Sequence, residues 1–227
     1  MTRLQAILLA AALLLLGCGR DRQTPEAASP APATPEQVDT RQVIVSFGDS
    51  LTEGYGVEPG HSYPDYLQQE LDRRGYPYRV VNAGISGDTT TGGLVRVSQV
   101  VELRPRLVIL ALGANDGLRG IPVSASQANL DQIIVTLRKA GAEVVLAGMT
   151  LPPNYGPDYI RSFEQMFTTL AARHKLPLIP FLLAGVAGTA EYMQNDGLHP
   201  NAEGCRRVAQ TVFQTLEPLL RAQQRGR

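Results

Sequence analysis

From about residue 42 onward, the chain alternates short, mainly apolar runs with longer amphipathic stretches. The apolar runs are rich in β-branched residues and lie at 43–45, 79–81, 107–110, 144–146 and 178–179. Such runs are typical of strands buried on both faces of a parallel sheet. The stretches between them predict helices at about 62–74, 91–103, 124–140, 158–174 and 201–222. This alternation predicts an α/β domain: a three-layer α/β/α sandwich around a five-stranded parallel sheet.

Local signals refine the helix ends. Ser124 is a plausible start for the third predicted helix, and Gly75 and Gly141 stand where C-terminal caps are expected. The third helix carries one apolar stripe, formed by Leu130, Ile133, Ile134 and Leu137.

The first 40 residues have a different character. Arg3 is followed by an apolar run at 4–16, shorter than the roughly 20 residues of a comfortable membrane span. The run ends in Leu15-Leu16-Gly17-Cys18, which resembles the lipobox of bacterial lipoproteins. The resemblance implies that 1–17 is a lipoprotein signal peptide and that Cys18 is acylated. An ordinary secretory peptide is the alternative.

Residues 18–40 combine the predicted lipidated cysteine with a segment rich in Pro, Ala, Ser and Thr. Such a composition favours a solvated, semi-rigid tether, so we expect the folded domain at 41–227. Gly19 is not Asp, so the inner-membrane retention signal of such lipoproteins is absent. We therefore expect a lipid-anchored protein of the cell envelope, at the outer membrane and facing the periplasm.

Composition excludes several classes of function. The chain of 227 residues has 21 Lys+Arg against 21 Asp+Glu, which leaves no basic excess for nucleic-acid binding. Its 2 Cys cannot build a disulfide framework or a cysteine zinc cluster.

In a parallel sheet, chemistry collects at the carboxyl ends of the strands. Gly48-Asp49-Ser50-Leu51 directly follows the first apolar run, which places a serine hydroxyl at the rim of the sheet as a candidate nucleophile. The alternative is structural, because Ser50 and Glu53 also match a capping box. The Gly-x-Ser-x-Gly motif is missing around Ser50, which disfavours an ordinary α/β-hydrolase.

Two further loops follow the second and third apolar runs. The loop at 82–88 contains Gly87, and the loop at 112–117 contains Asn115, whose amide could donate to an oxyanion. Each loop alone also fits a simple turn.

A serine nucleophile needs a general base and a carboxylate that orients it. Asp196 and His199 stand three residues apart before the last predicted helix, and Pro200 suits the first position of that helix. The alternative is a turn followed by a capped helix, with His199 merely exposed. His61 lies in a polar loop and His174 ends an amphipathic helix, so both are weaker candidates.

Together these loops supply the groups of an acyl-transfer site in the order Ser, Gly, Asn, Asp–His. The segment from about 42 to 220 therefore resembles the SGNH (GDSL) hydrolase family, whose fold is flavodoxin-like, and within it the thioesterase I/lysophospholipase L1/arylesterase subgroup. The resemblance implies Ser50, Asp196 and His199 as catalytic residues. It implies an oxyanion hole of Ser50, Gly87 and Asn115. It also implies substrate-binding positions, which are Asp49, Leu51, Leu118, Pro153 and Tyr155.

The expected activity is hydrolysis of carboxylic esters without cofactor or metal. Aryl esters, short-to-medium acyl esters and lysophospholipids are the expected substrates, with acyl thioesters as an additional capacity. Two alternatives stay open: an O-acetyl esterase acting on envelope polysaccharide, and a non-catalytic lipid-binding lipoprotein. The expected partners are a small acyl ester or lipid and the membrane that holds the N-terminal lipid, and we expect a monomer. The loop at 149–160 offers at best a mildly apolar lining.

Overall fold

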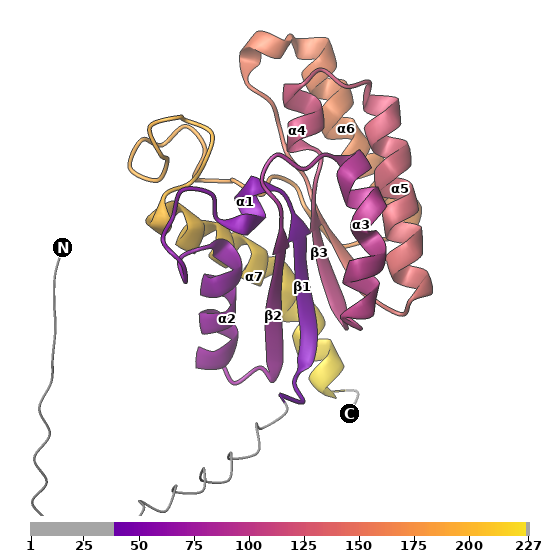
Figure 1. Cartoon of the computed structure of the whole chain (residues 1–227), viewed down its shortest axis with the longest axis vertical. Helices are drawn as coiled ribbons and strands as arrows, with labels where there is room; N and C mark the ends of the chain where they lie inside the picture. Colours follow the sequence, from indigo (N-terminus) through magenta and orange to yellow (C-terminus); the bar gives the residue numbers. More distant parts are fainter. Residues whose placement is uncertain (1–38, 226–227) are drawn as a thin grey trace, which may run out of the picture. The chain divides into compact units, whose positions relative to one another are not determined.

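The computed structural model describes residues 39–225, so the predictions for the signal peptide, Cys18 and nearly all of the tether lie outside the described residues. Five parallel strands form one sheet in the order β2-β1-β3-β4-β5, as Figure 1 shows in part. Their bounds are β1 Gln42–Gly48, β2 Tyr78–Gly84, β3 Leu107–Ala111, β4 Glu143–Ala147 and β5 Leu178–Ile179. The predicted five-stranded parallel sheet is confirmed.

Helices cover both faces of this sheet. One face is covered by α2 (Tyr63–Arg73) and α7 (Ala202–Arg225). The other is covered by α3 (Thr90–Glu102), α5 (Val123–Lys139) and α6 (Pro157–His174). The three-layer sandwich is thereby confirmed.

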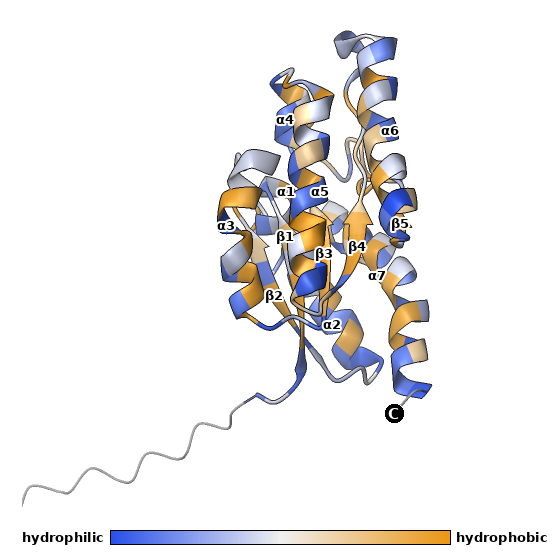
Figure 2. Ribbon diagram, turned by 90° about the vertical axis from the view of Figure 1, so that its right-hand side faces the viewer, coloured by the Kyte–Doolittle hydropathy of each residue, from blue (hydrophilic) through white to orange (hydrophobic). Residues whose placement is uncertain are grey.

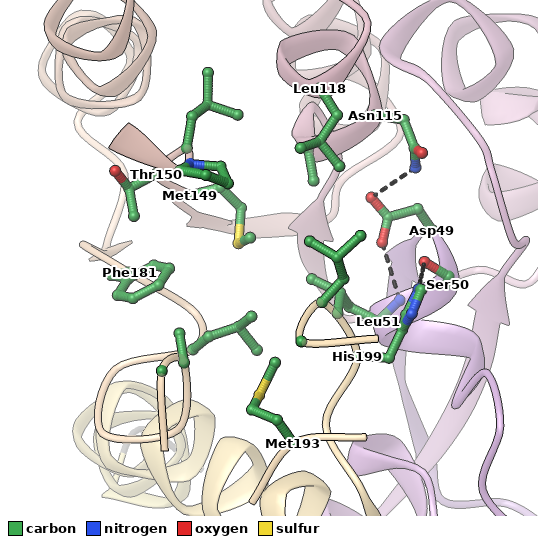
Figure 3. Close-up of a pocket in the computed structure, with 18 of the residues that line it drawn as sticks. Asp49, Ser50, Leu51, Asn115, Leu118, Met149, Thr150, Phe181, Met193 and His199 are labelled. Atoms are coloured by element: carbon green, nitrogen blue, oxygen red, sulfur yellow. Dashed lines mark hydrogen bonds between the residues drawn. The ribbon is translucent and has the colours of Figure 1, made fainter. Parts of the chain in front are cut away.

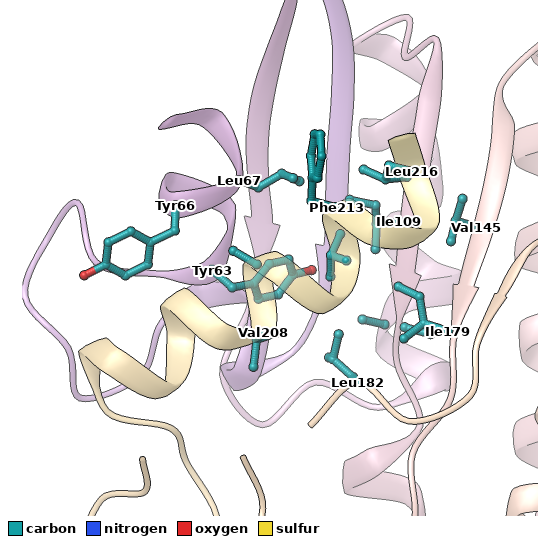
Figure 4. Close-up of a cluster of buried hydrophobic side chains, with 14 of the residues drawn as sticks. Tyr63, Tyr66, Leu67, Ile109, Val145, Ile179, Leu182, Val208, Phe213 and Leu216 are labelled. Atoms are coloured by element: carbon teal, nitrogen blue, oxygen red, sulfur yellow. The ribbon is translucent and has the colours of Figure 1, made fainter. Parts of the chain in front are cut away.

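Alternate side chains of each strand feed two separate cores. Ile44 of β1 packs toward α2 and α7, whereas Val43 and Val45 pack among the helices of the opposite face. Apolar residues therefore gather along the strands and on the inner sides of the helices (Figure 2). In the core against α7, Tyr63 and Phe213 lie between helix and sheet (Figure 4). Burial on both faces explains why the strands are continuous apolar runs.

Some predicted helix ends need correction. α5 begins at Val123 after Pro122, and Ser124 is not its cap. α7 begins at Ala202, so Pro200 is not its first residue. Instead, Asn201 Oδ1 accepts a hydrogen bond from the Gly204 N–H at 3.0 Å. The apolar stripe of α5 is buried as predicted.

The strand order places a crevice at the carboxyl end of β1. The chain leaves β1 through α2 to reach β2 on one side, and leaves β2 through α3 to reach β3 on the other. Ligands of doubly wound sheets bind where the connections diverge in this way. Three short elements surround the crevice: α1 (Ser50–Glu53), α4 (Ala114–Leu118) and a 3₁₀ turn, η1 (Pro153–Tyr155). Among the helices of residues 39–225, none is both long and apolar enough to span a membrane.

Candidate active site

Two glycines let α1 sit directly on the strand ends. A Cβ on Gly48 would lie 2.0 Å from Thr52 Oγ1, and one on Gly84 would lie 2.1 Å from the Glu53 amide nitrogen. Real Cβ atoms do not approach so closely, so any larger residue would push α1 away. The close packing places Ser50, the first residue of α1, at the rim of the sheet.

Asp49, and not Ser50, caps α1. Its Oδ1 accepts a hydrogen bond from the Leu51 N–H at 3.1 Å. The capping-box alternative for Ser50 and Glu53 is therefore wrong, and Glu53 instead accepts a hydrogen bond from the hydroxyl of Ser86. Because Asp49 satisfies the helix end, the Ser50 hydroxyl is left to a different partner.

That partner is His199, and the two catalytic loops meet at the crevice. His199 Nε2 lies 2.9 Å from Ser50 Oγ, and His199 Nδ1 lies 2.6 Å from Asp196 Oδ2 (Figure 3 shows the Ser50 contact). The backbone N–H groups of Leu198 and His199 donate to Asp196 Oδ1 at 2.9 and 3.0 Å. The bonds from the His199 N–H and ring lower the pKa of Asp196 to about 2. Asp196 is therefore ionised at neutral pH.

Backbone pairing holds the loop that carries His199. Met193 and Pro200 form an antiparallel bridge, and the Gln194 N–H donates to the His199 carbonyl at 2.8 Å. The Gln194 side chain donates to the Tyr55 carbonyl at 2.7 Å, and the Tyr55 ring lies 4.7 Å from the imidazole, centroid to centroid. This ties the imidazole to the segment that follows α1.

Asn115 lies on α4, and its side chain also points to the crevice at the carboxyl end of β1. Gly113 precedes this helix with a φ of +116°, a conformation that favours glycine. The Asn115 Nδ2 donates to the Asp88 carbonyl at 2.9 Å and lies 3.4 Å from Asp49 Oδ2. Gly87, immediately before Asp88, has a φ of +77°. The predicted oxyanion donors therefore come from neighbouring loops joined by the Asn115–Asp88 bond.

Buried carboxyl groups stand behind the crevice. Asp49 is 1 % exposed, and burial raises its pKa to about 6. Asp116, next to Asn115, is equally buried and accepts hydrogen bonds from the Thr90 N–H and hydroxyl and from the Ser126 hydroxyl. Asp116 thus ties α4 to α3 and α5.

A mostly apolar cavity of about 490 Å³ opens beside Ser50 and His199 (Figure 3). Its walls come from the loops after β1, β3 and β4 and from the segment between β5 and α7. The lining side chains include Leu51, Leu118, Met149, Leu151, Pro153, Phe181, Leu183, Met193 and Leu198. The cavity can accept an apolar group whose ester carbon lies at Ser50.

The predicted substrate-binding positions divide into two groups. Leu51, Leu118 and Pro153 line the cavity, as does the buried Asp49. Tyr155 is not among the lining residues. Its hydroxyl donates to the Leu118 carbonyl at 2.7 Å, so Tyr155 supports the wall from behind.

The residues between β5 and α7 that line the cavity were not predicted from the sequence. Phe181, Leu183 and Ala187 belong to a segment without helical or strand periodicity, so no pattern marked them. Their apolar character just beyond the last strand was the only available signal. As a result, the cavity is more apolar than the loop at 149–160 had suggested.

A metal centre has no counterpart in the described part of the chain. Among residues 39–225, no three His, Cys, Asp or Glu side chains gather closely enough to hold an ion. His174 pairs with Asp131 at 2.8 Å at the end of α6, and Cys205 is buried in α7.

Comparison with known proteins agrees with this geometry. The profile of the GDSL-like Lipase/Acylhydrolase family matches residues 46–207. The chain belongs to this family. It is 44 % identical to Esterase TesA of Pseudomonas aeruginosa over 180 residues, which cover 79 % of this chain and 90 % of that protein. It is 40 % identical to an arylesterase of Vibrio mimicus, covering 76 % and 87 %. It is 35 % identical to thioesterase 1/protease 1/lysophospholipase L1 of Escherichia coli K12, covering 78 % and 84 %.

Solved structures give the same result. The crystal structure of TesA aligns with a TM-score of 0.76 over 78 % of this chain and 99 % of that one, at 44 % identity. The psychrotrophic esterase EstA from Pseudoalteromonas sp., inhibited by monoethylphosphonate, also aligns with a TM-score of 0.76, at 34 % identity over 79 % and 99 %. The chain is thus an SGNH-family esterase.

Proposed function

We propose that this esterase hydrolyses esters with an apolar acyl group through an acyl-enzyme on Ser50. The observation that carries the proposal is the Ser50–His199–Asp196 hydrogen-bond chain at the mouth of an apolar cavity. A nucleophile, a base and a group that orients the base are the parts that acyl transfer requires.

In the first step, Ser50 Oγ attacks the ester carbonyl carbon while His199 Nε2 accepts the hydroxyl proton. The ionised Asp196 holds the Nδ1 proton and stabilises the imidazolium that forms. The backbone N–H groups of Ser50 and Gly87 and the Asn115 amide stabilise the negative charge on the carbonyl oxygen.

The tetrahedral intermediate collapses when the bond to the leaving oxygen breaks. His199 gives its proton to that oxygen, and the alcohol departs. Water then attacks the acyl-enzyme by the same route, with His199 again as base, which releases the acid and restores Ser50.

The apolar cavity favours medium-length acyl esters, aryl esters and lysophospholipids as substrates. Burial of each methylene contributes about 0.8 kcal/mol, so a cavity of this kind rewards a longer acyl chain. Relatives named arylesterase and lysophospholipase support this range, and thioester hydrolysis belongs to the same chemistry. An acetylated polysaccharide needs a polar cleft, which Leu118, Met149 and Phe181 do not provide.

The direct test is hydrolysis of p-nitrophenyl esters from two to sixteen carbons by the wild type, Ser50→Ala and Ser162→Ala. Ser162 is exposed on α6 and serves as the matched control. We expect Ser50→Ala to lose at least about 10⁴-fold in kcat, and the control to keep wild-type activity. A folded Ser50→Ala protein with undiminished activity would refute the mechanism, and the lipid-carrier alternative would return if the wild type hydrolysed no ester.

We also propose a lipid anchor at Cys18 and a place in the cell envelope, supported by the 15–18 motif and the tether composition. Labelling with a radioactive fatty acid, followed by membrane fractionation, tests both. The wild type should carry label and sediment with membranes, and Cys18→Ala should do neither. A soluble, unlabelled wild type would indicate an ordinary secretory peptide.

A further inference from the structure

Arg96 of α3 is a charged side chain that the mechanism leaves unused, although it lies beneath the site. Its side chain is 11 % exposed, and its guanidinium carbon lies 4.5 Å from the centre of the Phe47 ring. It makes three hydrogen bonds. Nη2 donates to the Gly48 carbonyl at 2.8 Å, Nη1 to the Ala83 carbonyl at 2.9 Å and Nε to Asp88 Oδ2 at 2.7 Å.

These acceptors lie next to each of the three oxyanion donors. Gly48 ends β1 two residues before Ser50, and its carbonyl also accepts the Ile85 N–H at 3.1 Å. Asp88 directly follows Gly87, and its carbonyl accepts the Asn115 side chain at 2.9 Å. One guanidinium therefore contacts the segments that carry Ser50 and Gly87, and it reaches the Asn115 amide through Asp88.

We propose that Arg96 is a positioning residue that sets the spacing of the oxyanion hole. The inference rests on the proposed function, because it assigns a role only if Ser50, Gly87 and Asn115 stabilise an oxyanion. Oxyanion donors act through preorganisation, so an error of a few tenths of an ångström in their spacing reduces the rate without changing substrate binding.

The geometry requires arginine. A planar guanidinium presents five donors in a fixed fork, and here it reaches two carbonyls and a carboxylate in three directions. A lysine ammonium carries one compact charge on a flexible stem and cannot hold the three acceptors at the same spacing. Gly92 makes room for this arrangement, because a Cβ there would lie 1.8 Å from Asp88 Oδ1.

The test compares wild type, Arg96→Lys, Asn115→Ala and the double variant on one soluble p-nitrophenyl ester, well below each unfolding temperature. We expect Asn115→Ala to lose about 10²–10³-fold in kcat. Arg96→Lys should lose about 10–100-fold in kcat and leave KM within about threefold, the signature of an interaction made in the transition state. The double variant should lose clearly less than the product of the two single losses, because Arg96 acts partly through Asn115.

Arg106→Lys is the matched control, since Arg106 pairs with Glu143 at the opposite end of the strands. A kcat for Arg96→Lys equal to that of the control, or a double loss equal to the product, would overturn the positioning role and leave only a structural one. If Asn115→Ala kept full activity, the oxyanion assignment itself would fail. If Arg96→Lys does not fold, Asp88→Asn is the variant to measure. The proposal predicts that Asp88→Asn lowers kcat and leaves KM unchanged. A wild-type kcat in Asp88→Asn would overturn the proposal.

Discussion

The two walls of the active site are built in opposite ways. The strand-end wall, residues 48–51, 84–88 and 113–118, carries the proposed nucleophile and oxyanion donors, and its Asp49 and Asp116 are each 1 % exposed. The C-terminal wall, residues 181–199, carries the proposed base, and the side chains of His199 and Asp196 are 20 % and 38 % exposed.

Different interactions hold the two walls. Buried polar and charged side chains fasten the strand-end wall to α3 and α5, as in the Arg96–Asp88 pair and the bonds of Asp116 to Thr90 and Ser126. Hydrogen bonds within the C-terminal wall and to its immediate neighbours hold His199, such as that from the Gln194 N–H to the His199 carbonyl. Charge develops at the strand-end wall during the reaction, and there a rigid dipole arrangement contributes most. In the proposed mechanism, the strand-end wall therefore supplies preorganised hydrogen-bond donors, and the C-terminal wall supplies proton transfer.

The largest expected effect lies in the C-terminal wall. Asp196→Asn should reduce kcat by about 10⁴-fold, because an amide no longer holds the imidazole in the tautomer that accepts the serine proton. The free energy of unfolding at pH 7 should fall only modestly, because the lowered pKa of Asp196 stabilises the folded state but the side chain is 38 % exposed. Steady-state kinetics and thermal unfolding at pH 7 check both statements.

The pKa of Asp196 sharpens this prediction. Its value of about 2 keeps the carboxylate charged above about pH 4, so Asp196 does not cause any loss of activity between pH 4 and 7. A lowered pKa contributes stability above the unfolded value, and that contribution disappears as the pH falls toward 2. An Asp196→Asn enzyme within tenfold of wild-type kcat would show that the imidazole needs no carboxylate.

The second prediction concerns stability and the strand-end wall. Burial raises the pKa of Asp49 from 3.8 to about 6. The folded state then binds the proton more tightly than the unfolded state, so stability falls as the pH rises from about 4 to about 6. Asp49→Asn removes this dependence. The wild type should lose about 2 kcal/mol of unfolding free energy relative to Asp49→Asn between pH 4 and pH 7.

Urea unfolding at the two pH values measures this difference. Asp158→Asn serves as the control, because the Asp158 side chain is 91 % exposed and its replacement should leave the pH dependence as in the wild type. Equal pH dependence in the wild type and Asp49→Asn would mean that the Asp49 charge is not desolvated.

The two walls also differed in how far the sequence could predict them. Ser50, Gly87 and Asn115 follow strands through short loops, and the strand order brings such loops together. Asp196 and His199 were found because the chemistry demanded a base with an orienting carboxylate. The capping box that is the structural alternative for Ser50 does not form, because the neighbouring Asp49 is an equally good capping residue and caps α1.

The only sequence signal for the apolar lining of the C-terminal wall is the apolar character of its residues. Phe181 and Leu183 belong to an irregular segment, and side chains in such a segment can point inward or outward with equal ease. Tyr155 shows a related ambiguity. A tyrosine in a loop suits a substrate contact and a bond to a backbone carbonyl equally well, and here it bonds to Leu118.

The smallest expected effect tests the cavity in that wall. Ala184 and Ala187 lie three residues apart in the same segment and are both exposed, and of the two only Ala187 lines the cavity. Ala187→Phe should fill part of the 490 Å³ and lower kcat/KM for esters of ten or more carbons by about tenfold, with acetyl ester hydrolysis nearly unchanged. Ala184→Phe adds the same ring outside the cavity and should leave the chain-length profile as in the wild type. If Ala187→Phe depressed short and long esters equally, the ring would be disturbing the His199 loop, and the acyl group would have to lie elsewhere.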